Sequence, residues 1–183
     1  MPAAPKLRQL ATRFARARRG ATAVEFAMIA GPLLLLIFGI LELALVFMVS
    51  TTLETATALA ARPIRTGELQ TSGAASAENF KKSVCDRMSW LGSDCAENLR
   101  VEVRSYVDFT SVGQDDDPVK DCWAPGGPTD IVFVQTSYYW RIFTPLISAA
   151  LVNDGSDRRR IVAVEVFRNE PYSDAPAEKG STC

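Results

Sequence analysis

The longest apolar stretch of the chain begins at Phe26 and determines how the other segments are interpreted. No charged residue interrupts Phe26–Leu41, and after Glu42 a second uncharged run extends from Leu43 to Leu53. An α-helix rises about 1.5 Å per residue, so the first run covers about 24 Å of a hydrocarbon core that is about 30 Å thick. The pattern therefore predicts a membrane-spanning helix that reaches or passes Glu42.

The segment before this helix is basic and the rest of the chain is acidic. Residues 1–20 contain six of the 20 Lys and Arg residues and no acid, which leaves 14 basic against 21 acidic residues afterwards. Because basic flanks stay in the cytoplasm, we expect a cytoplasmic N-terminus and an outer C-terminal part. The first residues can form an amphipathic helix on the inner leaflet or a disordered leader. The acidic outer part argues against nucleic-acid binding.

The predicted helix continues beyond the membrane to Arg62. We expect Pro63 to end it, because proline disfavours helical conformation in the residue before it. Inside the membrane, Pro32 removes one backbone hydrogen bond and is expected to kink the helix. Four residues of the outer part fall near one face, which is expected to pack on other elements: Leu53, Ala56, Leu59 and Ala60.

The remaining chain alternates between helical and strand patterns. A helix is predicted from a cap at Ser76 to about Trp90, and a short one after Thr144-Pro145. Alternating apolar residues predict strands at 99–109 and 160–168, and 131–143 has the strongest strand signal of the chain. The segment 114–128 is interpreted as a loop. The expected fold class is α+β: a long N-terminal transmembrane helix, then a small domain with an antiparallel sheet of three or more strands and packed helices.

All four cysteines follow the predicted membrane helix: Cys85, Cys95, Cys122 and Cys183. An even number in an oxidising compartment favours two disulfides, for which three connectivities are possible. Cys85 and Cys95 flank a helix end, which suits a local bridge and would leave Cys122 to pair with Cys183.

Few residues are candidates for catalysis or metal binding. Histidine is absent, which excludes Ser-His-Asp and Cys-His catalysis and most catalytic zinc sites. Asp115–Asp117 with Asp121 could offer oxygen ligands to Ca²⁺, but the spacing matches no known loop and a solvated acidic turn is preferred. We expect no enzymatic activity, no cofactor and no metal.

Two features leave alternatives open. Glu42 can pair with a partner inside the membrane or extend to its outer boundary. An aromatic group in the second predicted strand is expected to pack mainly in the core, although it can also form an exposed contact surface: Tyr138, Tyr139, Trp140 and Phe143.

The residues around Gly20 form a more specific pattern than a membrane anchor requires. Gly20 follows two arginines, four small or uncharged residues follow it, and Glu25 stands fifth after it, before Phe26. This pattern resembles the processing site of type IV pilin-like precursors. The run GATAVEFAMIAGPLLLLIFGILELALVF is similar to TadE-like pseudopilins of the tight adherence (Flp) pilus. A plain basic-flanked anchor is the simpler alternative.

The resemblance implies processing by prepilin peptidase between Gly20 and Ala21. Ala21 departs from the aromatic residue or methionine that usually begins mature type IV pilins. The resemblance also assigns assembly roles in the apolar helix, to Glu25 above all and to Phe26, Pro32 and Glu42. LAARPIRTGELQ, DIVFVQTSYYWRIFTPL and VFRNEPY are similar to the family in a looser way.

The resulting hypothesis is a minor pilin of the Flp pilus that takes part in biogenesis, adhesion and filament initiation. Its parts would be a basic leader at 1–20, a transmembrane helix with a periplasmic extension at 21–62 and a periplasmic domain at 63–183. It would sit in the bacterial inner membrane, in or at the tip of the pilus. Its partners would be prepilin peptidase, the major Flp pilin, other TadE/TadF-like pseudopilins, the pilus platform and membrane lipid. A type II secretion pseudopilin and an uncleaved, anchored periplasmic binding protein are the alternatives.

Overall fold

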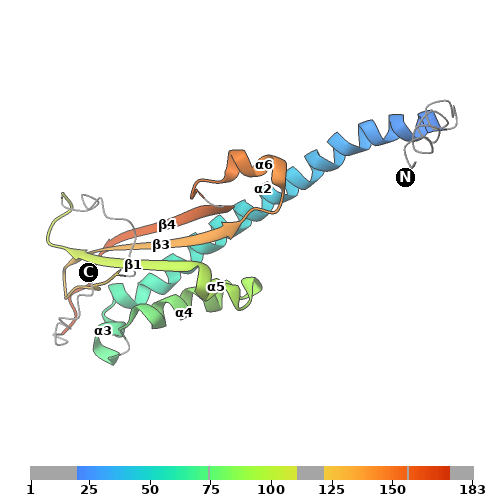
Figure 1. The fold of residues 1–183 in the computed structure, drawn as a ribbon. Coiled ribbons are helices and arrows are strands. Elements are labelled where there is room, and N and C mark those ends of the chain that lie inside the picture. Colours follow the sequence, from blue (N-terminus) through green and yellow to red (C-terminus); the bar gives the residue numbers. More distant parts are fainter. Residues whose placement is uncertain (1–19, 74, 111–121, 156, 174–183) are drawn as a thin grey trace, which may run out of the picture. The chain divides into compact units, whose positions relative to one another are not determined.

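The structure, a computed structural model, describes residues 20–73, 75–110, 122–155 and 157–173. The chain divides after Leu43 into two compact units, each described by itself. The described part of the first unit is Gly20 and the beginning of helix α2 (Ala21–Arg65). The second unit contains the rest of α2 and an α+β domain (Figure 1).

Helix α2 extends further than the sequence predicted. It continues through Pro63 to Arg65, so the expected end at Arg62 was wrong. Proline removes only one backbone hydrogen bond, and three side chains of the last turns are buried in the core: Ala60, Ala61 and Ile64. Gly67 follows in the left-handed conformation, with φ 77°. A Cβ at Gly67 would collide with the ring of Tyr172.

The second unit contains a four-stranded sheet in the order β2-β1-β3-β4. Its long strands β1 (Leu99–Tyr106), β3 (Ile131–Arg141) and β4 (Arg158–Arg168) are antiparallel neighbours, as predicted. The short strand β2 (Cys122–Trp123) pairs with β1 in parallel. The sheet is therefore mixed rather than antiparallel, and part of the predicted 114–128 loop is a strand.

Short helices surround this sheet (Figure 1). Helix α4 (Ala77–Arg87) begins as predicted, because the Ser76 hydroxyl accepts a hydrogen bond from the Asn79 amide at 3.1 Å. The short 3-10 helix η2 (Ser89–Leu91) follows α4, and helix α6 (Pro145–Leu151) follows β3. The sequence did not predict α3 (Glu68–Ser72) and α5 (Asp94–Asn98), which have five residues each.

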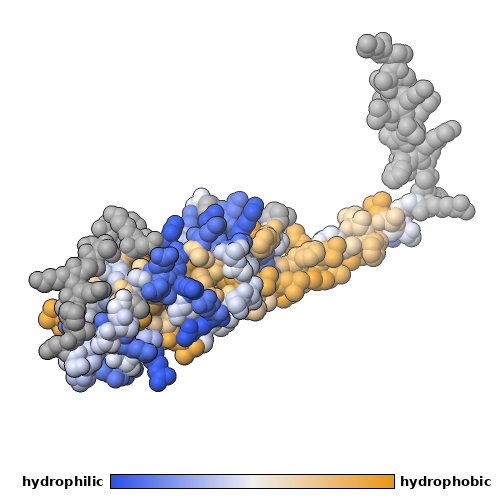
Figure 2. All heavy atoms as spheres, turned by 90° about the horizontal axis from the view of Figure 1, so that it is seen from below, coloured by the Kyte–Doolittle hydropathy of each residue, from blue (hydrophilic) through white to orange (hydrophobic). Residues whose placement is uncertain are grey.

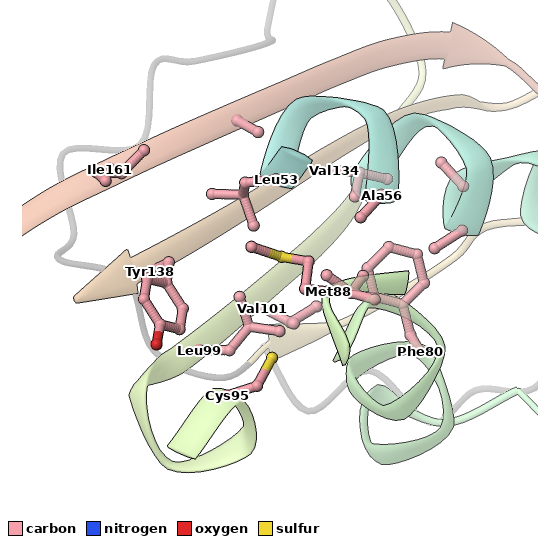
Figure 3. Packing of buried hydrophobic residues seen from close by; sticks show 14 of the residues in the cluster. Leu53, Ala56, Phe80, Met88, Cys95, Leu99, Val101, Val134, Tyr138 and Ile161 are labelled. Atoms are coloured by element: carbon pink, nitrogen blue, oxygen red, sulfur yellow. The ribbon is translucent and has the colours of Figure 1, made fainter. Parts of the chain in front are cut away.

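The core of the second unit lies between one face of the sheet and two helices, α4 and the outer half of α2 (Figure 3). Leu53 of α2 and Phe80 of α4 meet Leu99 and Val134 of the sheet there. Residues three and four apart form the buried stripe of α2: Val46, Val49, Leu53, Ala56, Ala60 and Ile64. Leu59 is 48% exposed, contrary to the prediction, because it lies about 120° around the helix from Leu53, which is in the middle of this stripe.

Candidate functional site

Gly20 lies directly before α2, and Ala21 is the first residue of the helix. An added Cβ at Gly20 would meet nothing within 4 Å. The local fold therefore leaves room for a larger side chain at this position. Any requirement for glycine must come from recognition by another molecule rather than from folding of the chain.

Glu25 lies one helical turn after Ala21. Four residues at about 1.5 Å each place the two Cα atoms about 6 Å apart along the helix axis, on one face. The Glu25 side chain is exposed, and so is Phe26 next to it, at 73%. A carboxylate is thus presented at the surface, within reach of an amine at the N-terminus of the helix if the chain were cut before Ala21.

Exposed apolar side chains follow one another along the first half of α2, without a gap from Leu33 to Phe38, and Figure 2 shows one side of this apolar surface. Among the described residues, one helix is long and apolar enough to cross a membrane, and its most apolar part has a mean hydropathy of 2.7. Most of that part is not buried by the protein itself. An apolar surface of this extent calls for lipid or other protein helices around it. It is compatible with a single-pass membrane anchor.

Glu42 is 4% exposed and has an interaction partner within the structure. The assembly role of Glu42 stays a prediction. Pro32 is exposed and lies within a continuous helix. The expected kink at Pro32 stays a prediction.

A disulfide joins Cys85 of α4 to Cys95 of α5, with their Cα atoms 5.7 Å apart. Cys122 is also disulfide-bonded, and no described cysteine is free. The predicted partner Cys183 lies outside the described residues. The Cys85–Cys95 bond ties α5 to the core helix α4, and Cys95 itself is buried.

Two tyrosines of the second unit have raised pKa values. Burial raises the pKa of Tyr138, and the negative charge of Asp94 raises it further. Burial and Asp130 also raise the pKa of Tyr172, although a hydrogen bond with Asn169 acts in the opposite direction. Both phenols therefore stay protonated and uncharged at neutral pH, which suits packing rather than nucleophilic attack.

No group of three or more possible metal ligands occurs among the residues that the structure describes. The acidic turn at Asp115–Asp117 and Asp121, the one calcium candidate in the sequence, lies outside them.

An aromatic cluster stands at the end of β3. Trp140 is 6.4 Å from Trp90 and 5.9 Å from Phe143, measured between ring centroids. Phe143 is 65% exposed and Trp90 is 40% exposed, whereas Tyr138 lies in the core. The predicted aromatic group therefore divides between core and surface. Trp90 comes from a different segment and was not predicted to join this group.

These features define a class of protein: one long, apolar N-terminal helix, compatible with a single-pass membrane anchor, followed by a small α+β domain. The sequence model of one family, described as TadE-like protein, matches residues 20–62. The resemblance seen in the sequence is thereby confirmed for this segment, which contains Gly20, Glu25 and nearly all of α2. Comparison with curated proteins and with solved structures finds no match.

Proposed function

We propose that this protein is a minor pilin of the tight adherence (Flp-type) pilus, taking part in pilus biogenesis, adhesion and filament initiation. The observation that carries the proposal is the match of residues 20–62 to the TadE-like family, together with the exposed apolar surface of the same segment. The chain would cross the bacterial inner membrane once, with residues 1–20 in the cytoplasm and the α+β domain in the periplasm.

Prepilin peptidase would remove the basic leader by cutting between Gly20 and Ala21. The cut creates an amine at the start of α2, one turn from Glu25. Within a single subunit in the membrane these two charges can neutralise each other. In an assembling filament, Glu25 would instead meet the amine of a neighbouring subunit, and the low dielectric would make a misplaced, unpaired charge costly. Glu25 would therefore determine the axial register between subunits.

The exposed first half of α2 would form the contacts with other subunits. Ala27 and Gly31 are four residues apart, and small residues at this spacing let a second helix approach closely. An added Cβ at Gly31 would meet nothing within 4 Å, so the space beside it is open. The partners would be the major Flp pilin, other TadE/TadF-like pseudopilins and the inner-membrane platform.

Processing can be tested by N-terminal sequencing of the protein extracted from membranes of cells with and without prepilin peptidase. We expect a mature chain beginning at Ala21 only when the peptidase is present. Gly20→Lys should block the cut and leave the fold unchanged, because Gly20 has open space around it. Gly31→Ala serves as the matched control and should be cut normally.

An intact leader in wild-type cells that contain active peptidase would contradict the proposal and favour an uncleaved periplasmic binding protein. Crosslinking to the subunits of a secretion system, rather than to pilins, would favour the type II secretion alternative.

A further inference from the structure

The direction of α2 relative to the sheet follows from two contacts inside the second unit. Near the end of α2, the Glu170 amide donates to the Arg65 carbonyl at 2.9 Å. Glu170 follows β4, whose last residue Arg168 pairs with Ile131 at the start of β3. The end of α2 therefore lies where β3 begins. The opposite end of the sheet, where β3 ends, lies beside an earlier part of α2.

The position along α2 follows from a buried hydrogen bond. The hydroxyl groups of Thr57 and Thr136 are 2.6 Å apart. The distance along β3 from Thr136 to its last residue, Arg141, is about 17 Å. In α2 the same length corresponds to about 11 residues, and 11 residues before Thr57 is Val46. Val46 is itself buried in the domain core, at 7% exposed. The end of the sheet therefore stands level with about Val46.

The run of apolar residues in α2 ends just beyond this level, at Val49. Phe47 is 69% exposed and Met48 is 46% exposed, and hydroxyl side chains begin at Ser50. If α2 spans a bilayer, the hydrocarbon ends near this point, because Ser50–Thr52 are the first consecutive polar residues after the apolar run. The end of the sheet would then lie at the level of the lipid headgroups.

The side chains at this end of the sheet suit such a position. The aromatic cluster described above consists of Trp90, Trp140 and Phe143. An open groove at this end is lined by Trp140 and Phe143 together with Asp94 and Arg158. Tryptophan is enriched at membrane interfaces, since its ring is apolar and its N–H is polar.

Charge does not favour an anionic surface at this end. Four arginines stand there, of which Arg159 is half-buried, and four exposed acids balance them: Arg141 and Arg158–Arg160 against Asp94, Glu97, Asp154 and Asp157. The aromatic rings are therefore the groups that would drive contact with lipid.

We propose that this aromatic end of the α+β domain, defined by Trp90, Trp140 and Phe143, contacts the headgroup region of the outer leaflet beside α2. The contact orients the domain on the membrane before assembly. It depends on aromatic insertion and not on anionic lipid. The proposal rests on the membrane anchoring of the proposed function and is independent of the pilus in which the protein would act.

The chain contains three tryptophans, which allows a test with internal controls. Three variants of the full chain, each with a single tryptophan and phenylalanine at the other two positions, are placed in nanodiscs whose lipids carry a nitroxide close to the headgroup. Trp140 and Trp90 should be quenched strongly. Trp123 should not be quenched, because it is 6% exposed and lies far from Trp140. It pairs with Val103, and Val103 pairs with Val134 of β3. Val134 is about 20 Å along the strand from Trp140.

Quenching of Trp140 that is no greater than that of Trp123 would overturn the proposal. Quenching that requires anionic lipid would also overturn it. Co-elution of the chain with the nanodiscs tests the anchor separately, so its loss would count against the proposed function instead.

A second comparison addresses the insertion itself. Phe143→Ser should reduce the quenching of Trp140 at least twofold. Phe109→Ser is the matched control, because Phe109 is equally exposed, at 60%, and follows β1 at the other end of the sheet. Equal quenching in the two variants would refute a role for Phe143.

Discussion

The buried hydrogen bond between Thr57 and Thr136 couples α2 to the sheet, and its removal gives a quantitative test of the fold. Both side chains are 0% exposed, and their hydroxyl oxygens are 2.6 Å apart. Thr57→Val replaces one hydroxyl by a methyl group of similar size and leaves the Thr136 hydroxyl without this partner. A buried polar group that loses its partner costs about 1–3 kcal/mol.

The double variant is expected to behave differently from the sum of the single ones. With valine at both positions, two methyl groups face each other and no unsatisfied hydroxyl is left from this pair. Replacement of both partners by apolar groups of the same shape is close to neutral. We therefore expect each single variant to lower the free energy of unfolding by about 1–3 kcal/mol. The double variant should lower it by at most half of that amount, which would show strong coupling between the two positions.

Thermal unfolding of the full chain in nanodiscs, followed by tryptophan fluorescence, measures the effect. For a unit of this size, 1 kcal/mol corresponds to about 3–5 °C in Tm. Thr55→Val is the control, because the Thr55 hydroxyl is exposed and donates only to the Thr51 carbonyl of its own helix. Additive losses in the double variant would show that the two hydroxyls do not depend on each other.

Three further predictions concern single positions. Glu25→Ala should permit insertion and processing but abolish crosslinks to other pilins and the formation of surface pili. The control Glu54→Ala, beyond the membrane, should retain the crosslinks and the pili. Normal pili in Glu25→Ala would contradict the assembly role of Glu25. Gly67→Ala should lower Tm more than Gly73→Ala, because both residues have positive φ but only Gly67 lies against Tyr172; equal losses would refute the steric reason. Cys95→Ser should destabilise the domain by about 2–3 kcal/mol, measured by thermal unfolding, and an unchanged Tm would argue against the Cys85–Cys95 bond.

Long, regular patterns made much of the fold predictable. The three long strands have eight to eleven residues each and are rich in β-branched, aromatic and other apolar residues, and α4 begins at a serine cap, so both carry local signals. Strand β2 has two residues, too few for alternation to be recognised. Helices α3 and α5 are shorter than two turns and equally lack a periodic pattern. Pro63 misled the prediction because burial of the last turns of α2 outweighs one missing hydrogen bond.

The candidate site was predictable where it depends on adjacent residues. Gly20 and Glu25 belong to one short segment, so their spacing can be read directly from the sequence. The contact of Trp90 with Trp140, in contrast, depends on elements far apart in the chain. Apolar periodicity assigns a residue to a face of its own element, but it does not say which residues of other elements meet that face.

The two parts of α2 differ in what surrounds them, and this difference bears on assembly. The second part, after Leu43, packs on its own domain through a single buried apolar stripe, so the domain holds that part in a fixed way. The first part, up to Leu43, leaves large apolar side chains exposed, among them Phe26, Ile29 and Phe38. Lipid tails are as apolar as these side chains, so exchanging lipid for a neighbouring helix brings little hydrophobic gain. Under the proposed function, subunits can therefore leave the membrane without unfolding of the domain. Their axial position in the filament is then determined by close packing at small residues and by the charge of Glu25.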